Sequence, residues 1–271
     1  MTTAPARGRR PALALTGLYA GRARSVVRRA ARAHRHQWLD LAAGLVEPLC
    51  YLVLFGATLG ALIGDVRTPF GPMPYTAFLG PGLLASAMMS SAVADTSFKV
   101  LFRLRHSRLY DVLLATPLGP VDIALGEIGW ALVRSAGYAA VFLAVLTAMG
   151  EAHTWWTLLA LPAAVLTAFA FAATGMAATT FLRNWKDLDL ISLATLPMSL
   201  LSTTFFPLSA YPGPLRPFVE AVPLTHAVRL LRGLCSGAPT PDLLLNAGYL
   251  AAVAALGVLV TGRRLATLLL D

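Results

Sequence analysis

The sequence predicts an all-α integral membrane protein with six transmembrane helices. Hydrophobic residues make up 57% of the 271 residues and charged residues only 13%, whereas soluble domains have about 25% charged residues. A helix needs about 20 mostly apolar residues to cross a hydrocarbon core of roughly 30 Å. Six stretches meet this requirement, at residues 41–63, 75–98, 128–149, 155–182, 188–206 and 243–260. These long continuous runs are typical of membrane helices rather than of the short alternating strands of a barrel.

The positions of the basic residues predict the orientation of the spans. Nine of the 22 lysines and arginines precede residue 36, and four lie within residues 99–108. Two more pairs occur at 183/186 and 263/264. If six spans alternate, all these groups fall on one side, and the positive-inside rule places that side and both termini in the cytoplasm. The net charge of +9 does not indicate nucleic-acid binding, which needs aromatic residues interleaved with the basic ones on a soluble domain. We therefore expect a protein of the cytoplasmic (plasma or inner) membrane.

Residues 1–40 form a separate basic arm, and residues 41–271 form the six-span domain. The arm lacks the long apolar run and the cleavage site of a secretory signal. Residues 22–40 are predicted to form an amphipathic interfacial helix, held on the inner leaflet by anionic lipids and by Trp38 at headgroup level. The alternative is a solvated basic tail that only enforces orientation.

The segment between spans five and six, residues 207–242, is predicted to form short re-entrant helices. It contains seven prolines, which oppose a single spanning helix, yet it is too apolar for a free loop. We expect two helices at 215–221 and 224–234 that dip into the outer leaflet. Pro207, Arg229 and Arg232 would then form an outer gate, with the two arginines near headgroups or an anionic substrate. The alternative is ordinary packing outside the membrane.

The chain lacks the means to hydrolyse ATP through a P-loop, because that motif needs Gly-Lys-Ser or Gly-Lys-Thr. The two lysines, Lys99 and Lys186, stand in Phe-Lys-Val and Trp-Lys-Asp. A transporter of this sequence would therefore depend on a partner ATPase or on an ion gradient. Glu47 and Arg134 lie deepest in the predicted spans and would be the residues of a gradient-driven secondary transporter. An intramembrane enzyme is less favoured, because the histidines that a serine hydrolase would need lie outside the spans.

Three sequence blocks carry a family resemblance. The first is YTAFLGPG at 75–82, followed by ASAMMS at 85–90, and the second is TPL at 116–118 with DIALGE at 122–127. The third begins with FFPLS at 205–209 and continues through PLTH at 223–226 to LLRG at 230–233. In this order the blocks resemble the membrane subunits of type-2 ABC exporters, in the branch of nodulation protein J and the daunorubicin-resistance permeases.

The resemblance implies an assembly of two membrane subunits, here a homodimer, with two copies of a partner ABC ATPase. ATP and Mg would be bound by that partner, and this chain would hold no cofactor and no metal. A coupling helix between spans two and three, at about 107–116, would dock on the ATPase. Glu127 is expected at a helix N-terminus one residue before the third span, where the helix dipole favours a carboxylate; an acidic residue here is linked to the ATPase contact in the family, and plain capping is the alternative. The expected coupling residues are Arg105, Arg108, Leu109, Tyr110, Asp111, Leu113 and Glu127.

By analogy with the family, spans two and five line the substrate path. The residues expected there are Phe78, Met88, Ser199, Ser202, Thr203, Phe205 and Phe206. Their mixed hydroxyl and aromatic character suits an amphipathic molecule, although hydroxyls in spans also join neighbouring helices. The predicted function is that of the transmembrane subunit of an ATP-driven exporter for a hydrophobic drug or antibiotic, a lipid or a lipo-oligosaccharide.

Overall fold

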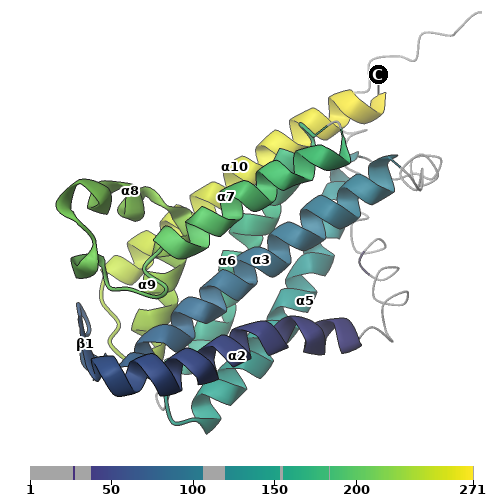
Figure 1. The fold of residues 1–271 in the computed structure, drawn as a ribbon. Coiled ribbons are helices and arrows are strands. Elements are labelled where there is room, and N and C mark those ends of the chain that lie inside the picture. The colour runs from purple at the N-terminus through teal and green to yellow at the C-terminus, as the bar shows by residue number, and fades with distance from the viewer. Residues whose placement is uncertain (1–26, 28–37, 106–119, 153–154, 183, 271) are drawn as a thin grey trace, which may run out of the picture.

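The computed structural model describes residue 27 and residues 38–105, 120–152, 155–182 and 184–270, and these residues are mainly helical (Figure 1). The long helices are α2 (Trp38–Ile63), α3 (Tyr75–Arg105), α5 (Pro120–Ala148), α6 (Thr157–Thr179) and α10 (Asp242–Leu270). The shorter elements are the antiparallel strands β1 (Asp65–Thr68) and β2 (Gly71–Pro74), the helices α7 (Leu188–Leu201), α8 (Arg216–Ala221) and α9 (Pro223–Cys235), and the single 3-10 turns η2 (Trp185–Asp187), η3 (Leu208–Ala210) and η4 (Gly213–Leu215).

Five of the described helices are long and apolar enough to cross a membrane, namely α2, α3, α5, α6 and α10. They account for five of the six predicted spans. The remaining stretch, 188–206, forms only the 14-residue helix α7, which rises about 21 Å. At Ser202 the backbone becomes extended, so the rest of this stretch leaves the helix. The structure therefore supports a multi-pass membrane protein without establishing a sixth full-length helical span.

Helix α6 lies at the centre of the bundle and packs against α3, α5 and α10. Most of its inward positions are alanine or glycine, and such small side chains allow helix backbones to approach closely. Gly257 of α10 illustrates the effect, because a Cβ atom there would lie 2.7 Å from the backbone carbon of Ala173 in α6. The core of the protein is thus built around a helix with little side-chain volume.

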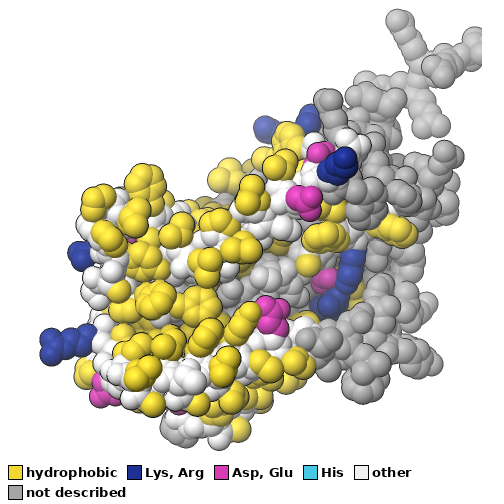
Figure 2. Space-filling model, in the orientation of Figure 1, with side chains coloured by type: hydrophobic (Ala, Val, Ile, Leu, Met, Phe, Trp, Pro, Cys, Tyr) yellow, Lys and Arg dark blue, Asp and Glu magenta, His cyan; other side chains and the backbone are white. Residues whose placement is uncertain are grey.

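Helices α2 and α7 lie at the edge of this bundle. Helix α2 meets α3 near the β1–β2 hairpin, where a Cβ at Gly56 would lie 2.8 Å from Thr76 Cγ2, and then turns away from α3 (Figure 1). In α7 only Leu188 is buried. Both helices expose large apolar side chains, which include Val53 and Leu54 of α2 and Leu193 and Leu196 of α7, and hydrophobic side chains dominate this face of the molecule (Figure 2). The edge helices therefore leave apolar surface for lipid or for another protein chain.

The N-terminus of α5 differs from the prediction. The helix begins at Pro120, where a proline fits the first turn because its missing N–H is not needed there. Asp122 supplies the acidic charge of that turn. Glu127 lies about two turns inside the helix and is buried, so the expectation that it stands at the helix N-terminus was wrong.

The structure tests the predictions for the outer helices, the coupling helix and the basic arm only in part. Helices α8 and α9 agree with the predicted helices 215–221 and 224–234 to within one residue at each end. Their entry into the outer leaflet stays a prediction. The coupling helix at 107–116 lies outside the described residues, as does almost all of the basic arm at 1–37.

Candidate functional site

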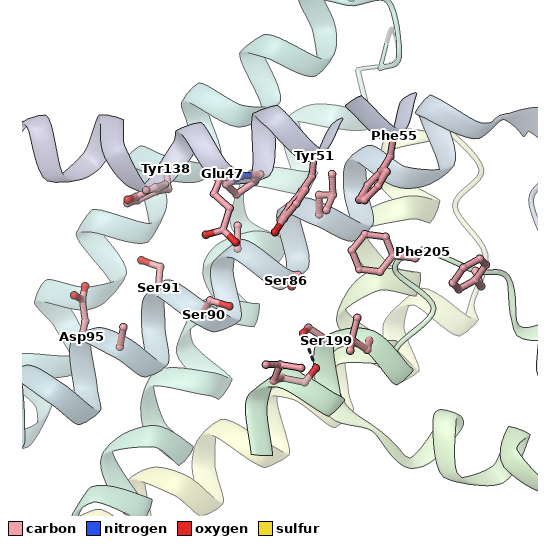
Figure 3. Close-up of a pocket in the computed structure, with 18 of the residues that line it drawn as sticks. Glu47, Tyr51, Phe55, Ser86, Ser90, Ser91, Asp95, Tyr138, Ser199 and Phe205 are labelled. Carbon is pink, nitrogen blue, oxygen red and sulfur yellow. Dashed lines mark hydrogen bonds between the residues drawn. The ribbon is translucent and has the colours of Figure 1, made fainter. Parts of the chain in front are cut away.

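A cavity of about 930 Å³ lies between α2, α3, α5, α7 and the segment that follows α7. Figure 3 shows side chains from these elements converging on it. The cavity runs along the middle of α3, from Leu83 to Asp95. We call the end at Asp95 and Arg134 the charged end, and the end at Phe55, Phe205 and Phe206 the aromatic end.

The wall contributed by α3 is a stripe of small and hydroxyl side chains. Ser86, Ala87, Ser90, Ser91 and Ala94 all line the cavity, and their spacing of three or four residues places them on one face of the helix. Short side chains on this stripe leave the space open. The three serines provide polar atoms beside the two alanines of this stripe, so the cavity can contact both parts of an amphipathic molecule.

The charged end is organised by Asp95. Its Oδ1 atom accepts hydrogen bonds from Lys99 Nζ at 2.7 Å and from Arg134 Nη1 at 2.8 Å. Only 8% of the Asp95 side chain and 13% of the Arg134 side chain are exposed. Asp95 Oδ2 is buried and has no hydrogen-bond partner within the described part of the chain. Since Arg134 belongs to α5, this ion pair joins α3 to α5 beside the cavity.

Glu47 of α2 lies between the two ends. Its carboxylate is directed toward α3, near Ser90 (Figure 3). No residue in the described ranges forms a hydrogen bond or ion pair with Glu47. One turn further along α2, Tyr51 lines the same cavity.

Stacked and edge-on rings form the aromatic end. The rings of Tyr51 and Phe55 stack with centroids 5.6 Å apart, and Phe55 meets Phe205 edge-on at 6.0 Å. The Tyr75 hydroxyl donates a hydrogen bond to the Phe205 carbonyl at 3.3 Å, which holds the segment after α7 against α3. Aromatic pairs of this geometry stabilise a packed apolar wall.

Arg232 of α9 fixes the same segment from the other side. Its Nε donates to the Phe78 carbonyl at 3.1 Å and its Nη2 donates to the Thr203 carbonyl at 2.8 Å. The guanidinium also lies 3.6 Å from the centroid of the Phe78 ring. Burial lowers the pKa of Arg232 to about 9, so the group is still protonated at neutral pH. Gly82 permits this close approach, because a Cβ there would lie 3.0 Å from the Thr204 backbone.

A comparison with known protein families shows which family this chain belongs to. The model of the family described as "ABC-2 type transporter" matches residues 23–235. The chain belongs to the ABC-2 type transporter family. It is therefore a membrane permease subunit rather than an enzyme, and the family implies an ABC ATPase as its partner.

Curated relatives of this ABC-2 permease agree with the family. The chain is 33% identical over 212 residues to nodulation protein J of Rhizobium leguminosarum bv. trifolii, covering 78% of this chain and 79% of that protein. It is 30% identical over 218 residues to nodulation protein J of Bradyrhizobium diazoefficiens, covering 80% and 82%. It is 25% identical over 179 residues to the inner membrane transport permease YadH of Escherichia coli K12, covering 65% and 67%.

The structure of the permease distributes the predicted path residues over several places. Ser199, Phe205 and Phe206 line the large cavity. Ser202 is buried and shares a 2.7 Å hydrogen bond with the Thr204 hydroxyl. Met88 is buried in the core. Phe78 and Thr203 lie with the three predicted gate residues, Pro207, Arg229 and Arg232, around a second cavity of about 590 Å³.

The two gate arginines of the permease have different surroundings. Arg232 is buried and binds backbone carbonyls, rather than facing headgroups or a substrate. Arg229 forms a 3.0 Å ion pair with Glu220 of α8 at a more exposed position. The expected coupling residues Arg108, Leu109, Tyr110, Asp111 and Leu113 lie outside the described residues, and Arg105 is described only as the last residue of α3.

Sequence reasoning missed most of the cavity wall. The serines at 86, 90 and 91 and Tyr51 line the cavity but were absent from the predicted substrate path. The spacing of the serines along one helix face was visible in the sequence. It identified no ligand-binding face by itself, because a hydroxyl stripe also serves contacts between helices.

Proposed function

We propose that this permease subunit, driven by its partner ABC ATPase, exports an amphipathic substrate across the cytoplasmic membrane. The observation that carries the proposal is the large cavity, which is charged at one end and aromatic at the other. Its volume of about 930 Å³ lies within the range of about 300–1,000 Å³ that is typical of small-molecule sites. A drug-like antibiotic, a lipid or the lipid part of a lipo-oligosaccharide has the matching division into polar and apolar parts.

The working unit that we propose is a homodimer of this chain with two ATPase copies. The exposed helices α2 and α7 support it, because both line the cavity and a second chain packed against them would close the cavity toward the lipid. Helix α7 and the extended residues after it would together form the fifth crossing of the membrane. With six crossings both termini lie in the cytoplasm, and the basic residues favour this orientation.

ATP hydrolysis would reach the cavity through α3 and α5. Helix α3 ends at Arg105 and α5 starts at Pro120, so the proposed coupling helix at 107–116 falls between them in the sequence. The ion pair between Asp95 and Arg134 links these two helices at the charged end. A displacement of the coupling helix by the ATPase would therefore move both helices together and change the shape of the cavity.

Release would occur past α8 and α9, which we propose to be re-entrant helices of the outer leaflet. Arg232 ties α9 to the backbone of α3 and to the residues after α7. Because these residues also form the aromatic end, a movement of α7 or α9 would open or close that end.

The test is ATP hydrolysis by the complex of this chain and its ATPase in lipid nanodiscs. We expect amphipathic compounds to stimulate hydrolysis, and we expect Ala94→Phe, which places a ring in the cavity, to abolish the stimulation. Ala140→Phe is the matched control, because Ala140 is exposed on α5 and does not line the cavity. The double variant Tyr110→Ala, Asp111→Ala should lose the complex or its coupling.

Two results would contradict the proposed function. One is a chain that binds no ATPase and transports its substrate only with a proton or sodium gradient, which would make it a secondary transporter. The other is equal stimulation of the wild type, Ala94→Phe and Ala140→Phe, which would place substrate binding outside the cavity.

A further inference from the structure

Glu47 is a carboxylate in a membrane-spanning helix without a partner in the described part of the chain. Ionisable side chains within the membrane are costly and are normally paired or used for function. Glu47 is exposed, and its side chain lines the large cavity and points toward α3 (Figure 3). A group that enters the cavity is thus the available partner for this carboxylate.

The charges around the cavity lie in two separate places. Three charged side chains line the cavity among the described residues, namely Glu47, Asp95 and Arg134. Asp95 forms ion pairs with Arg134 at 2.8 Å and with Lys99, outside the lining, at 2.7 Å, which leaves the charged end with a net positive charge. Glu47 lies apart from this cluster and is the negative charge of the lining that has no ion pair in the described part of the chain.

An aromatic ring beside Glu47 also suits a cation. The Tyr51 ring lies one helical turn from Glu47 on the same face of α2 and is part of the lining. A carboxylate beside an aromatic ring attracts an ammonium group through its charge and through the electrons of the ring.

We propose that the cavity selects amphiphiles whose polar part carries a positively charged amine, with Glu47 as the residue that recognises the charge. The ammonium group lies between Glu47 and Tyr51, and the hydrocarbon part extends toward Phe55 and Phe205 at the aromatic end. Lys99 and Arg134 repel a cation from the charged end and so keep it at Glu47. This assignment rests on the proposed function, because it names the substrate class of the same cavity.

The test measures binding without ATP, in the full-length chain reconstituted in nanodiscs of zwitterionic lipid. Octyltrimethylammonium is the cationic probe and octyl maltoside is the neutral one, each titrated calorimetrically with empty nanodiscs as the blank. We expect Glu47→Gln to weaken binding of octyltrimethylammonium about tenfold, since one lost charge contact of this kind changes an equilibrium constant by about that factor. Binding of octyl maltoside should stay the same.

Matched variants separate the role of Glu47 from a general effect of charge or folding. Glu151→Gln removes the same charge in the turn after α5, away from the cavity, and should leave both probes unaffected. Glu47→Asp keeps the charge and should retain most of the affinity for octyltrimethylammonium. Melting temperature and size-exclusion profile verify that each variant is folded.

The possible failures of the two proposals are distinguishable. If Glu47→Gln binds octyltrimethylammonium as the wild type does, the role of Glu47 is wrong, and loss of both probes in Ala94→Phe would still support the cavity as the amphiphile site. If Glu47→Gln instead loses both probes equally, Glu47 shapes the cavity and does not recognise charge. If Ala94→Phe binds each probe with the same affinity as the wild type, the binding site is not this cavity and both proposals are wrong.

Discussion

At the scale of single residues, Arg232 shows how a charged side chain can serve the fold. It is 5% exposed, and its two hydrogen bonds connect α9 with residues 154 and 29 positions away in the sequence. A buried charge is tolerated only when its hydrogen-bonding groups have partners. Here backbone carbonyls and the Phe78 ring provide them, so Arg232 holds together the elements beside the aromatic end.

Replacing Arg232 should therefore destabilise the protein far more than replacing Arg229, the other arginine of the predicted outer gate. Arg232→Ala leaves a void and removes the donors to two carbonyls, a combination that costs about 2–4 kcal/mol. Arg229→Ala removes only the half-exposed ion pair with Glu220, which is worth up to about 1 kcal/mol. Thermal unfolding of both variants in the same detergent tests this difference. Equal losses of stability would show that the contacts of Arg232 add little.

At the scale of elements, the bundle depends on the close approach of helices that carry small residues. Gly257 of α10 lies against Ala173 of α6 with no room for a side chain, whereas a Cβ atom at Gly248 of the same helix would have nothing within 4 Å in the described part of the chain. Within a helix, glycine costs roughly 0.5–1 kcal/mol relative to alanine. Position 257 thus requires a glycine for packing, whereas at position 248 an alanine would fit and would favour the helix.

The pair Gly257→Ala and Gly248→Ala separates helix propensity from packing. We expect Gly257→Ala to lower the melting temperature, because α10 must move away from the α6 backbone. We expect Gly248→Ala to leave it unchanged or to raise it slightly, because the substitution favours the helix and meets no described atom. Melting curves of the purified variants give the answer, and a stable Gly257→Ala protein would mean that the α6–α10 contact is loose.

At the scale of the whole molecule, the packed bundle of α3, α5, α6, α9 and α10 contrasts with the exposed helices α2 and α7. The cavity lies between these two parts, so one of its walls belongs to helices whose side chains are mostly exposed. A second copy of the chain that packs on α2 and α7 would complete that wall.

Cysteine cross-linking tests this arrangement. In a Cys50→Ser background we expect Leu193→Cys, exposed on α7, to form cross-linked dimers with a short bismaleimide in membranes. Leu158→Cys, which is as exposed but lies on α6, should remain monomeric. Cross-linking at both positions or at neither would argue against a dimer through α7.

Sequence alone was sufficient to predict the class of the protein, the positions of five spans, the two short helices α8 and α9 and the family. These features depend on local quantities: the length of an apolar stretch, the positions of prolines and the order of short motifs. The physical reason is that a bilayer demands about 20 consecutive apolar residues whatever the tertiary structure. The helix N-terminus was wrongly placed at Glu127 for an equally local reason, since Pro120 and Asp122 begin α5 eight residues before the predicted apolar span.

The residues that surround the cavity and the pairing of its charges emerge only from the packed bundle. The ion pair of Asp95 with Arg134 joins positions 39 residues apart, and Arg232 binds carbonyls on two separate segments. A sequence pattern identifies Glu47, Asp95, Arg134 and Arg232 as charges in apolar surroundings, but it does not show which of them is compensated. Pairing depends on how helices distant in the sequence are placed beside each other, and that placement left Glu47 facing the cavity while it buried Arg232.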